Sequence, residues 1–78
     1  MKYVYILENH ASEHFYIGLT DDLRARLAKH NAGEVPHTSK YKPWRLRTSV
    51  AFRDERQAVE LERYLKSGSG RAFAKRHF

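Results

Sequence analysis

The chain has 78 residues, no cysteine and a formal charge of +6, from fifteen Lys and Arg against nine Asp and Glu. This length fits one domain over residues 1–78, and the absence of cysteine excludes disulfides and thiolate metal sites. No apolar run approaches the roughly 20 residues of a membrane span, and no signal-peptide pattern is present, so we expect a cytoplasmic protein without a membrane partner. The positive charge favours a polyanionic partner such as nucleic acid.

Two β-rich stretches near the N-terminus are predicted to pair as a hairpin. They cover residues 2–7 and 14–20, and both alternate in side-chain character. The apolar sides of these strands carry Val4, Ile6, Phe15, Ile17 and Leu19. If those sides face the core, Tyr5, Tyr16 and Gly18 lie together on the opposite face. We expect an aromatic patch there, with an open position at Gly18 where a bulky ligand could approach the backbone.

A polar stretch after the hairpin has the pattern of a helix. The helix is predicted over Asp21–Asn31, with its N-cap at Thr20 or Asp21 and its stop at Gly33. Leu23 and Leu27 are spaced i, i+4 and would pack this helix on the sheet. From Gly33 to Pro43 the sequence predicts an irregular loop.

The second half of the chain predicts one more strand and one more long helix. Over residues 45–52, Leu46, Thr48, Val50 and Phe52 alternate with Arg45, Arg47 and Ser49, which predicts a third strand with one basic side. Asp54 is a suitable N-cap for a helix whose buried stripe is Ala58, Leu61 and Leu65. Residues Ser67–Gly70 are expected to break it before a short helical piece at Arg71–Phe78. The fold class is therefore α+β, a small three-stranded antiparallel sheet flanked by helices in the order β-β-α-β-α with a short C-terminal helix.

Two short motifs resemble binding sites but have simpler interpretations. His10–His14 spells H-x-x-E-H, a zinc-protease signature that requires a helix, whereas these residues lie between two predicted strands. The run Ser67–Arg71 could bind a phosphate through backbone N–H groups, but it lacks the ending of a P-loop. A helix stop followed by an N-cap explains it more simply, and a contact with a DNA backbone stays open.

The combination of motifs resembles the GIY-YIG nuclease superfamily over nearly the whole chain. The first name-giving motif is similar to Tyr3-Val4-Tyr5, the second to Tyr16-Ile17-Gly18, and the arginine eight residues after the glycine is Arg26. The pattern around Glu62, Leu61 to Lys66, resembles the glutamate helix of the small stand-alone bacterial members. The chain departs from the family name at Tyr3, which stands in place of glycine, and from the repair enzymes at Leu19, which stands in place of lysine.

This resemblance implies a DNA endonuclease that hydrolyses phosphodiester bonds with Mg²⁺ or Mn²⁺, in repair, recombination or turnover. Glu62 would hold the metal, Arg26 would clamp the phosphate, and Tyr16 would position the reacting groups. Tyr5 or His30 would serve as the base or proton relay, and the sequence does not decide between them. Because Arg26 and a metal would both lower the pKa of Tyr5, an alkaline optimum is expected.

The expected partner is DNA, in double-stranded, branched or single-stranded form, with a homodimer or a protein partner supplying any targeting. Further contacts with nucleic acid are expected from Tyr3, Gly18, Thr20, Lys40, Arg45, Lys66 and Arg71. Two other classes remain open at this point. A non-catalytic nucleic-acid-binding module would use the same basic, tyrosine-lined face, and a protein-interaction domain would show little salt dependence.

Overall fold

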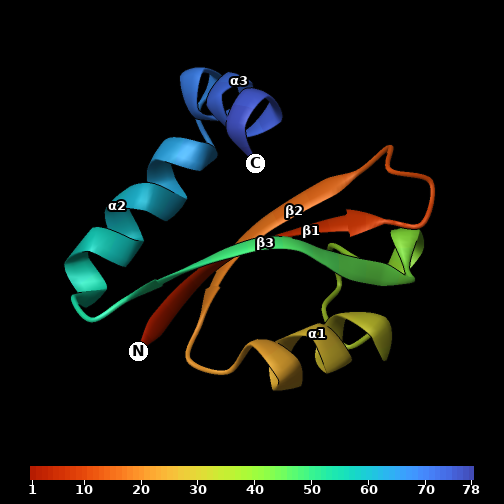
Figure 1. Ribbon diagram of the computed structural model, residues 1–78. Coiled ribbons are helices and arrows are strands. Elements are labelled where there is room, and N and C mark those ends of the chain that lie inside the picture. Colours follow the sequence, from red (N-terminus) through yellow and green to blue (C-terminus); the bar gives the residue numbers. More distant parts are fainter.

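The computed structural model describes residues 1–78 and contains one three-stranded antiparallel sheet with helices on both faces (Figure 1). The strands are β1 (Lys2–Asn9), β2 (Phe15–Thr20) and β3 (Trp44–Phe52), in the spatial order β2-β1-β3. β1 is therefore the central strand, and β2 and β3 are the two edge strands. This arrangement confirms the α+β class and the antiparallel pairing predicted from the sequence.

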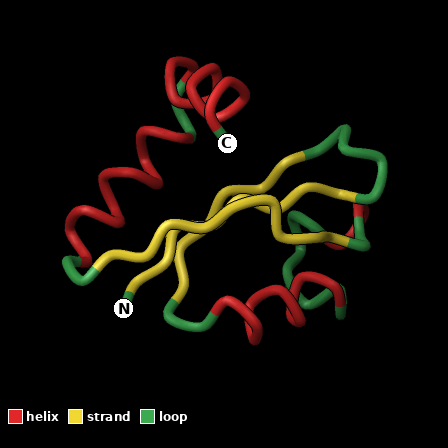
Figure 2. Tube along the Cα trace, in the orientation of Figure 1, coloured by secondary structure: helices red, strands yellow, loops and turns green.

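The helices cover opposite faces of the sheet. α2 (Glu55–Leu65) and α3 (Gly68–His77) lie on one side, and α1 (Leu23–Asn31) lies on the other, which is clear in the Cα trace (Figure 2). Because both faces of β1 are covered, its residues Val4, Tyr5, Ile6 and Leu7 are all buried. No helix in the structure combines the length and the apolar character needed to cross a bilayer.

Two small apolar clusters result, one on each face of the sheet. Val4 and Ile6 pack with Ala58 and Leu65 beneath α2. On the opposite face the buried residues are Tyr5, Leu7 and Trp44, and the partly buried residues packed against them are Tyr16, Leu23 and Leu27. Leu23 and Leu27 of α1 thus pack on the sheet as predicted, and they cover the aromatic patch expected at Tyr5.

The position expected to be open at Gly18 is also filled. Gly18 lies opposite Tyr5 in the β1–β2 register, and a Cβ at position 18 would collide with the hydroxyl and ring of Tyr5. The absence of a side chain at Gly18 therefore makes room for the phenol of the neighbouring strand rather than for an external ligand.

A β-bulge in β3 changes the predicted faces of that strand. The register pairs Ile6 with Thr48 but Leu7 with Leu46, which leaves Arg47 as the additional residue. Leu46 therefore lies on the α1 side, while Arg47 joins Arg45 on the face that carries Thr48. The simple alternation predicted for residues 45–52 was wrong at this point, because an inserted residue reverses the side-chain period of two.

Each helix begins at a side-chain cap. Asp22 accepts a hydrogen bond from the backbone N–H of Ala25 at 3.1 Å, so α1 starts later than predicted and neither Thr20 nor Asp21 is its N-cap. Thr20 instead accepts from the N–H of Asp22, which fixes the turn before the helix. The cap at Asp54, which accepts from Arg56 N–H at 2.9 Å, confirms the prediction for α2.

α3 is longer than the piece predicted at residues 71–78. Ser67 accepts from the N–H of Gly70 at 3.1 Å, so both glycines that were expected to interrupt the chain belong to the first turn of α3. Gly70 is required there, because a Cβ at this position would collide with the carbonyl of Tyr64. The break between the helices is therefore short, and α3 folds back toward the sheet.

Candidate active site

The phenol of Tyr5 is the centre of a hydrogen-bonded cluster between β1 and α1. Only 2% of Tyr5 is exposed, and its hydroxyl lies 3.1 Å from Nε2 of His30. Nε of Arg26 donates to the same hydroxyl at 3.3 Å. Arg26 and His30 are one helical turn apart on α1, so both reach the phenol from the same side. The shared face predicted for these two residues is confirmed.

A second set of hydrogen bonds fixes the tautomer of His30. Nδ1 of His30 lies 2.8 Å from Oγ1 of Thr38, which in turn donates to the carbonyl of Val35 at 3.3 Å. Assigning the single hydroxyl proton of Thr38 to the carbonyl of Val35, we infer that Nδ1 of His30 carries a proton and donates to Thr38. Nε2 of His30 is then free to accept the proton of the Tyr5 hydroxyl. The bonds form one directed chain from Arg26 to Val35.

Tyr16 extends this cluster to the free edge of the sheet. Its ring centroid lies 4.8 Å from that of His30 and 6.2 Å from that of Tyr5. Tyr16 belongs to the edge strand β2 and is only partly buried. The cluster is therefore closed toward the core at Tyr5 and open toward solvent at Tyr16.

The pKa values of the two central groups shift in opposite directions. Burial raises the pKa of Tyr5 and outweighs the hydrogen bond from Arg26, which lowers it. Burial and the charge of Arg26 lower the pKa of His30. Arg26 lowers the pKa of Tyr5 as expected, but without a metal the burial of this residue in the core outweighs that effect. At neutral pH this cluster contains a protonated phenol and a neutral imidazole.

Arg26 is a charged side chain without a carboxylate partner. It takes part in no salt bridge, although it is only partly exposed. The hydrogen bond with Tyr5 raises the pKa of Arg26, so the guanidinium stays charged. Its bond to Tyr5 uses Nε, which leaves the terminal nitrogens available for an anion.

Glu62 lies on α2, on the face of the sheet opposite to α1. Its negative charge is the last of the contributions that raise the pKa of Tyr5, after burial and Tyr16. It accepts a hydrogen bond from Nζ of Lys66 at 3.2 Å, as the i, i+4 spacing predicts, and 23% of its side chain is exposed.

The donor set around Glu62 fits one mode of metal binding. The structure contains no cluster of three or more His, Asp, Glu or Cys side chains that could hold an ion. Mg²⁺ commonly binds through one or two carboxylates, with water and substrate phosphates as its other ligands. Glu62 matches that mode, whereas a cage made entirely of protein ligands is not present. His10–His14, the motif set aside in the sequence, lies in the β1–β2 connection rather than on a helix.

The residues expected to contact nucleic acid fall into separate groups. Lys66 and Arg71 line one pocket, together with Tyr16 of the candidate catalytic set. Tyr3, Gly18 and Thr20 belong to the paired part of β1 and β2, where Tyr3 lies opposite Thr20. Lys40 is exposed on the short 3₁₀ helix Ser39–Tyr41, which lies in the stretch predicted to be irregular, and Arg45 is held by Glu8 at 3.1 Å.

The sequence analysis missed two residues that support His30, Thr38 in the loop after α1 and Trp44 at the start of β3. Thr38 is buried, and its carbonyl accepts a hydrogen bond from the indole of Trp44 at 2.8 Å. Asn31 at the end of α1 bonds both the N–H and the carbonyl of Trp44. The only available signal was weak, a single Trp directly before a predicted strand, and nothing in the sequence distinguished Thr38.

Comparison with known proteins identifies the family. Residues 1–76 match the GIY-YIG catalytic domain. A UPF0213 protein of Lacticaseibacillus paracasei is 43% identical over 53 residues, which make up 67% of this chain and 60% of the relative. A UPF0213 protein of Streptococcus pneumoniae serotype 4 is 37% identical over 65 residues, or 82% of this chain and 65% of the relative. The chain thus spans less than two thirds of the length of these two relatives.

A solved structure supports the same assignment. The solution NMR structure of the UPF0213 protein of Bacillus halodurans aligns with a TM-score of 0.58 and 34% sequence identity, over 96% of this chain and 81% of that one. The match over residues 1–76 carries the family assignment, and the similar fold agrees with it. The motifs Tyr3–Tyr5 and Tyr16–Gly18, with Arg26 and Glu62, lie within the matched residues. The chain belongs to the GIY-YIG family of nuclease-type catalytic domains.

Proposed function

We propose that residues 1–78 form a divalent-metal-dependent DNA endonuclease domain that hydrolyses phosphodiester bonds. The observation that carries this proposal is the hydrogen-bonded chain of Arg26, Tyr5 and His30, which ends in an arginine with no carboxylate partner. Glu62, on α2, is among the charges that raise the pKa of the same phenol. These groups supply the functions that phosphodiester hydrolysis requires, a base, a phosphate clamp and a metal ligand.

Arg26 is assigned to the scissile phosphate. Its planar terminal nitrogens can bind two phosphate oxygens at once, and no carboxylate competes for them. Because Tyr5 accepts from Nε, the guanidinium plane is held in a fixed orientation before the substrate arrives. This arrangement positions the developing charge on phosphorus next to a permanent cation.

Proton transfer is assigned to Tyr5 and His30 together. The attacking water gives a proton to the oxygen of Tyr5 while the phenol proton moves to Nε2 of His30. The hydroxide oxygen bonds to phosphorus, the leaving oxygen departs, and His30 ends as an imidazolium that still donates to Thr38. Since the raised pKa of Tyr5 disfavours a free phenolate, a relay into the neutral imidazole is the route that the cluster supports.

Glu62 is assigned to a single Mg²⁺ or Mn²⁺ ion, with water completing the shell. When bound, such an ion supplies Lewis-acid stabilisation of the leaving oxygen. Lys66 neutralises Glu62 in the absence of an ion and would move toward the substrate when one binds. Tyr16, at the edge of β2, would orient the phosphate or the water.

The site contains one set of reacting groups and would cut one strand at each encounter. A break in both strands would then require a homodimer or two encounters. The chain presents no recognition helix or zinc finger, so we assign specificity to DNA shape or to a protein partner. Roles in repair, recombination or DNA turnover in the cytoplasm fit such an activity.

A cleavage assay with a matched pair of variants tests this proposal. Glu62→Gln removes the metal ligand, whereas Glu60→Gln changes an exposed neighbour on the same helix. Supercoiled plasmid, flap DNA and single-stranded DNA would be incubated with each protein in Mg²⁺, Mn²⁺ or EDTA. We expect metal-dependent cutting by the wild type and by Glu60→Gln, and binding without cutting by Glu62→Gln. Binding by all three proteins without cutting in either metal would instead indicate a non-catalytic nucleic-acid-binding module.

A further inference from the structure

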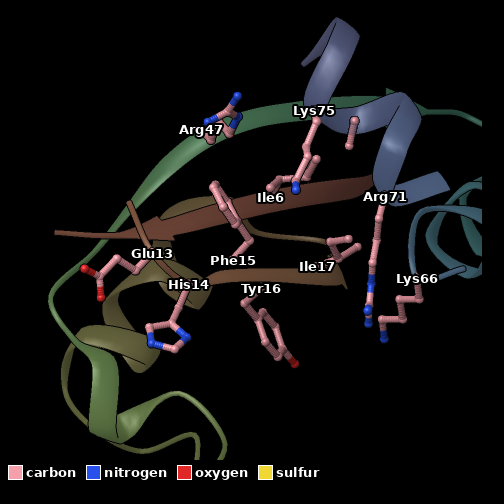
Figure 3. Close-up of a pocket in the computed structure, with 11 residues that line it drawn as sticks. Ile6, Glu13, His14, Phe15, Tyr16, Ile17, Arg47, Lys66, Arg71 and Lys75 are labelled. Atoms are coloured by element: carbon pink, nitrogen blue, oxygen red, sulfur yellow. The ribbon is translucent and has the colours of Figure 1, made fainter. Parts of the chain in front are cut away.

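A pocket of about 550 Å³ lies beside the candidate active site, between the beginning of β2 and α3. Its volume falls within the range of small-ligand pockets. Figure 3 shows Lys75 and Arg71 extending from α3 toward the strands, with Phe15 rising from β2 between them and Arg47. We propose that this pocket holds one unstacked nucleotide of the DNA strand that is cut. The inference rests on the proposed nuclease function and specifies its substrate class.

The charge of the pocket suits a phosphate. Arg47, Lys66, Arg71 and Lys75 line it from three different elements. Arg47 is bound to Glu8 and Lys66 to Glu62, whereas Arg71 and Lys75 form no salt bridge. These two free cations are one turn apart on α3, so they present their charges on one side of the helix. The only carboxylate in the lining is the exposed Glu13.

The apolar part of the pocket suits a base. Phe15 is 47% exposed although it is a large apolar residue of a strand. The guanidinium of Arg47 lies over its ring at 5.3 Å, and Ile6, Ile17 and Ala74 complete the apolar wall. An exposed aromatic ring beside free cations is the combination that single-stranded nucleic acid uses, because bases stack on the ring while the backbone contacts the cations.

The pocket is continuous with the active site at two residues. Tyr16 lines the pocket and also contacts His30, with ring centroids 4.8 Å apart. Lys66 lines the pocket and also contacts Glu62. A strand whose phosphate lies at Arg26 can therefore continue past Tyr16 to the pocket. A base inside a duplex has neighbours on both faces and cannot stack on Phe15 as well, so the nucleotide held there must be unpaired.

Binding measurements without metal test this subsite independently of cutting. Wild-type protein, Phe15→Leu and Phe73→Leu would be titrated in EDTA with a labelled single-stranded oligonucleotide and with its duplex. Phe15→Leu keeps an apolar side chain but removes the stacking ring, and Phe73, another exposed aromatic, does not line the pocket. We expect Phe15→Leu to bind the single strand roughly 5- to 100-fold more weakly and the duplex unchanged, with Phe73→Leu like the wild type.

A second variant tests the phosphate contacts. Arg71→Gln combined with Lys75→Gln is expected to lower the salt dependence of single-strand affinity by about 1.4 units of slope, about 0.7 for each lost phosphate contact. The subsite would be overturned if Phe15→Leu bound the single strand as tightly as the wild type and the double variant kept the salt slope of the wild type. Metal-dependent cutting by the wild type would not be affected by that outcome. Conversely, binding that depends on Phe15 without cutting in any metal would refute the nuclease and leave the subsite intact.

Discussion

Tyr5 and Gly18 lie directly opposite each other in the β1–β2 pair, and the phenol of Tyr5 occupies the space where a side chain at position 18 would be. The glycine therefore determines where the central hydroxyl of the active site lies. A residue without a side chain on an edge strand thus fixes the geometry of a hydrogen bond to His30 on a helix.

Gly18→Ala is expected to abolish cutting while leaving most of the fold in place. The added methyl group would push the Tyr5 ring away from His30 and Arg26, which breaks the proton relay. Gly68→Ala is the matched control, because a Cβ at Gly68 meets nothing within 4 Å. Rates of plasmid nicking and circular dichroism of both variants would be compared. Full activity in Gly18→Ala would contradict the proposed role of Tyr5.

Thr38→Val is expected to destabilise the fold and to slow the reaction. It removes the acceptor of the Nδ1 proton of His30 and leaves that buried donor unsatisfied, at a cost of about 1–3 kcal/mol in the free energy of unfolding. Thr38→Ser keeps the hydroxyl and should retain both stability and rate. Urea denaturation and initial cleavage rates measure the two effects, and a Val variant as fast as the Ser variant would show that Thr38 does not orient His30.

The lowered pKa of His30 predicts a loss of stability at mildly acidic pH. The unfolded chain binds a proton at His30 near pH 6.5, whereas the folded protein resists this until the pH is lower. The contribution of His30 is therefore complete above about pH 6.5 and is lost as the pH falls through the lowered folded value. The Glu8 carboxylate, whose pKa is also lowered, responds only below about pH 4.5. The melting temperatures of wild type and His30→Gln would be measured across this pH range. If the two plots of melting temperature against pH ran parallel, His30 would not be the group responsible for the loss of stability.

The same groups predict the pH dependence of cutting. The relay requires neutral His30, so the turnover rate should rise through the pKa of His30, below about 6.5, and then stay level through neutral pH. Because the pKa of Tyr5 is raised, its ionisation adds no further rise before strongly alkaline pH. This profile replaces the alkaline optimum expected from the sequence. A rate that keeps climbing tenfold per unit above neutral pH would restore Tyr5 phenolate as the base.

Arg26→Lys is expected to reduce cutting strongly although the charge is kept. Lysine lacks both the planar pair of nitrogens for the phosphate and the Nε–H that binds Tyr5, and loss of one such donor typically lowers turnover by about 100- to 1,000-fold. Arg24→Lys, at an exposed position on the same helix, serves as the control. Single-turnover rates and DNA affinity separate the chemical step from binding. A rate equal to that of Arg24→Lys would exclude the clamp.

Much of the fold was predictable because local signals agree with it. Strand alternation, the cap at Asp54 and the left-handed Gly33 that follows α1 all depend on residues near each other in sequence. The predictions were wrong where contacts between residues far apart in the sequence determine the structure. Burial of Tyr5 depends on α1 packing over its face, and the reversed side of Leu46 depends on a bulge that the alternation does not reveal.

The positions of the candidate site residues on their elements were predictable, but the hydrogen bonds between them were not. Arg26 and His30 could be placed on one face from helical spacing, and Glu62 from the family pattern. Thr38 could not be predicted, because a threonine in an irregular loop resembles many others, and only the folded chain brings it within 2.8 Å of His30. The direction of the Tyr5 pKa shift was also missed, since it depends on burial.

The apolar cluster beneath α1 has only three buried members, and one of them is Tyr5. The same side chain therefore serves both the folding of this face and the chemistry assigned to it. Few substitutions should be tolerated in this cluster, because a substitution that repacks Leu7 or Trp44 also moves the reactive hydroxyl of Tyr5. The cluster beneath α2 contains none of the hydrogen-bonded residues and can accept exchanges among apolar residues. We expect related sequences to vary more on the α2 side of the sheet than on the α1 side.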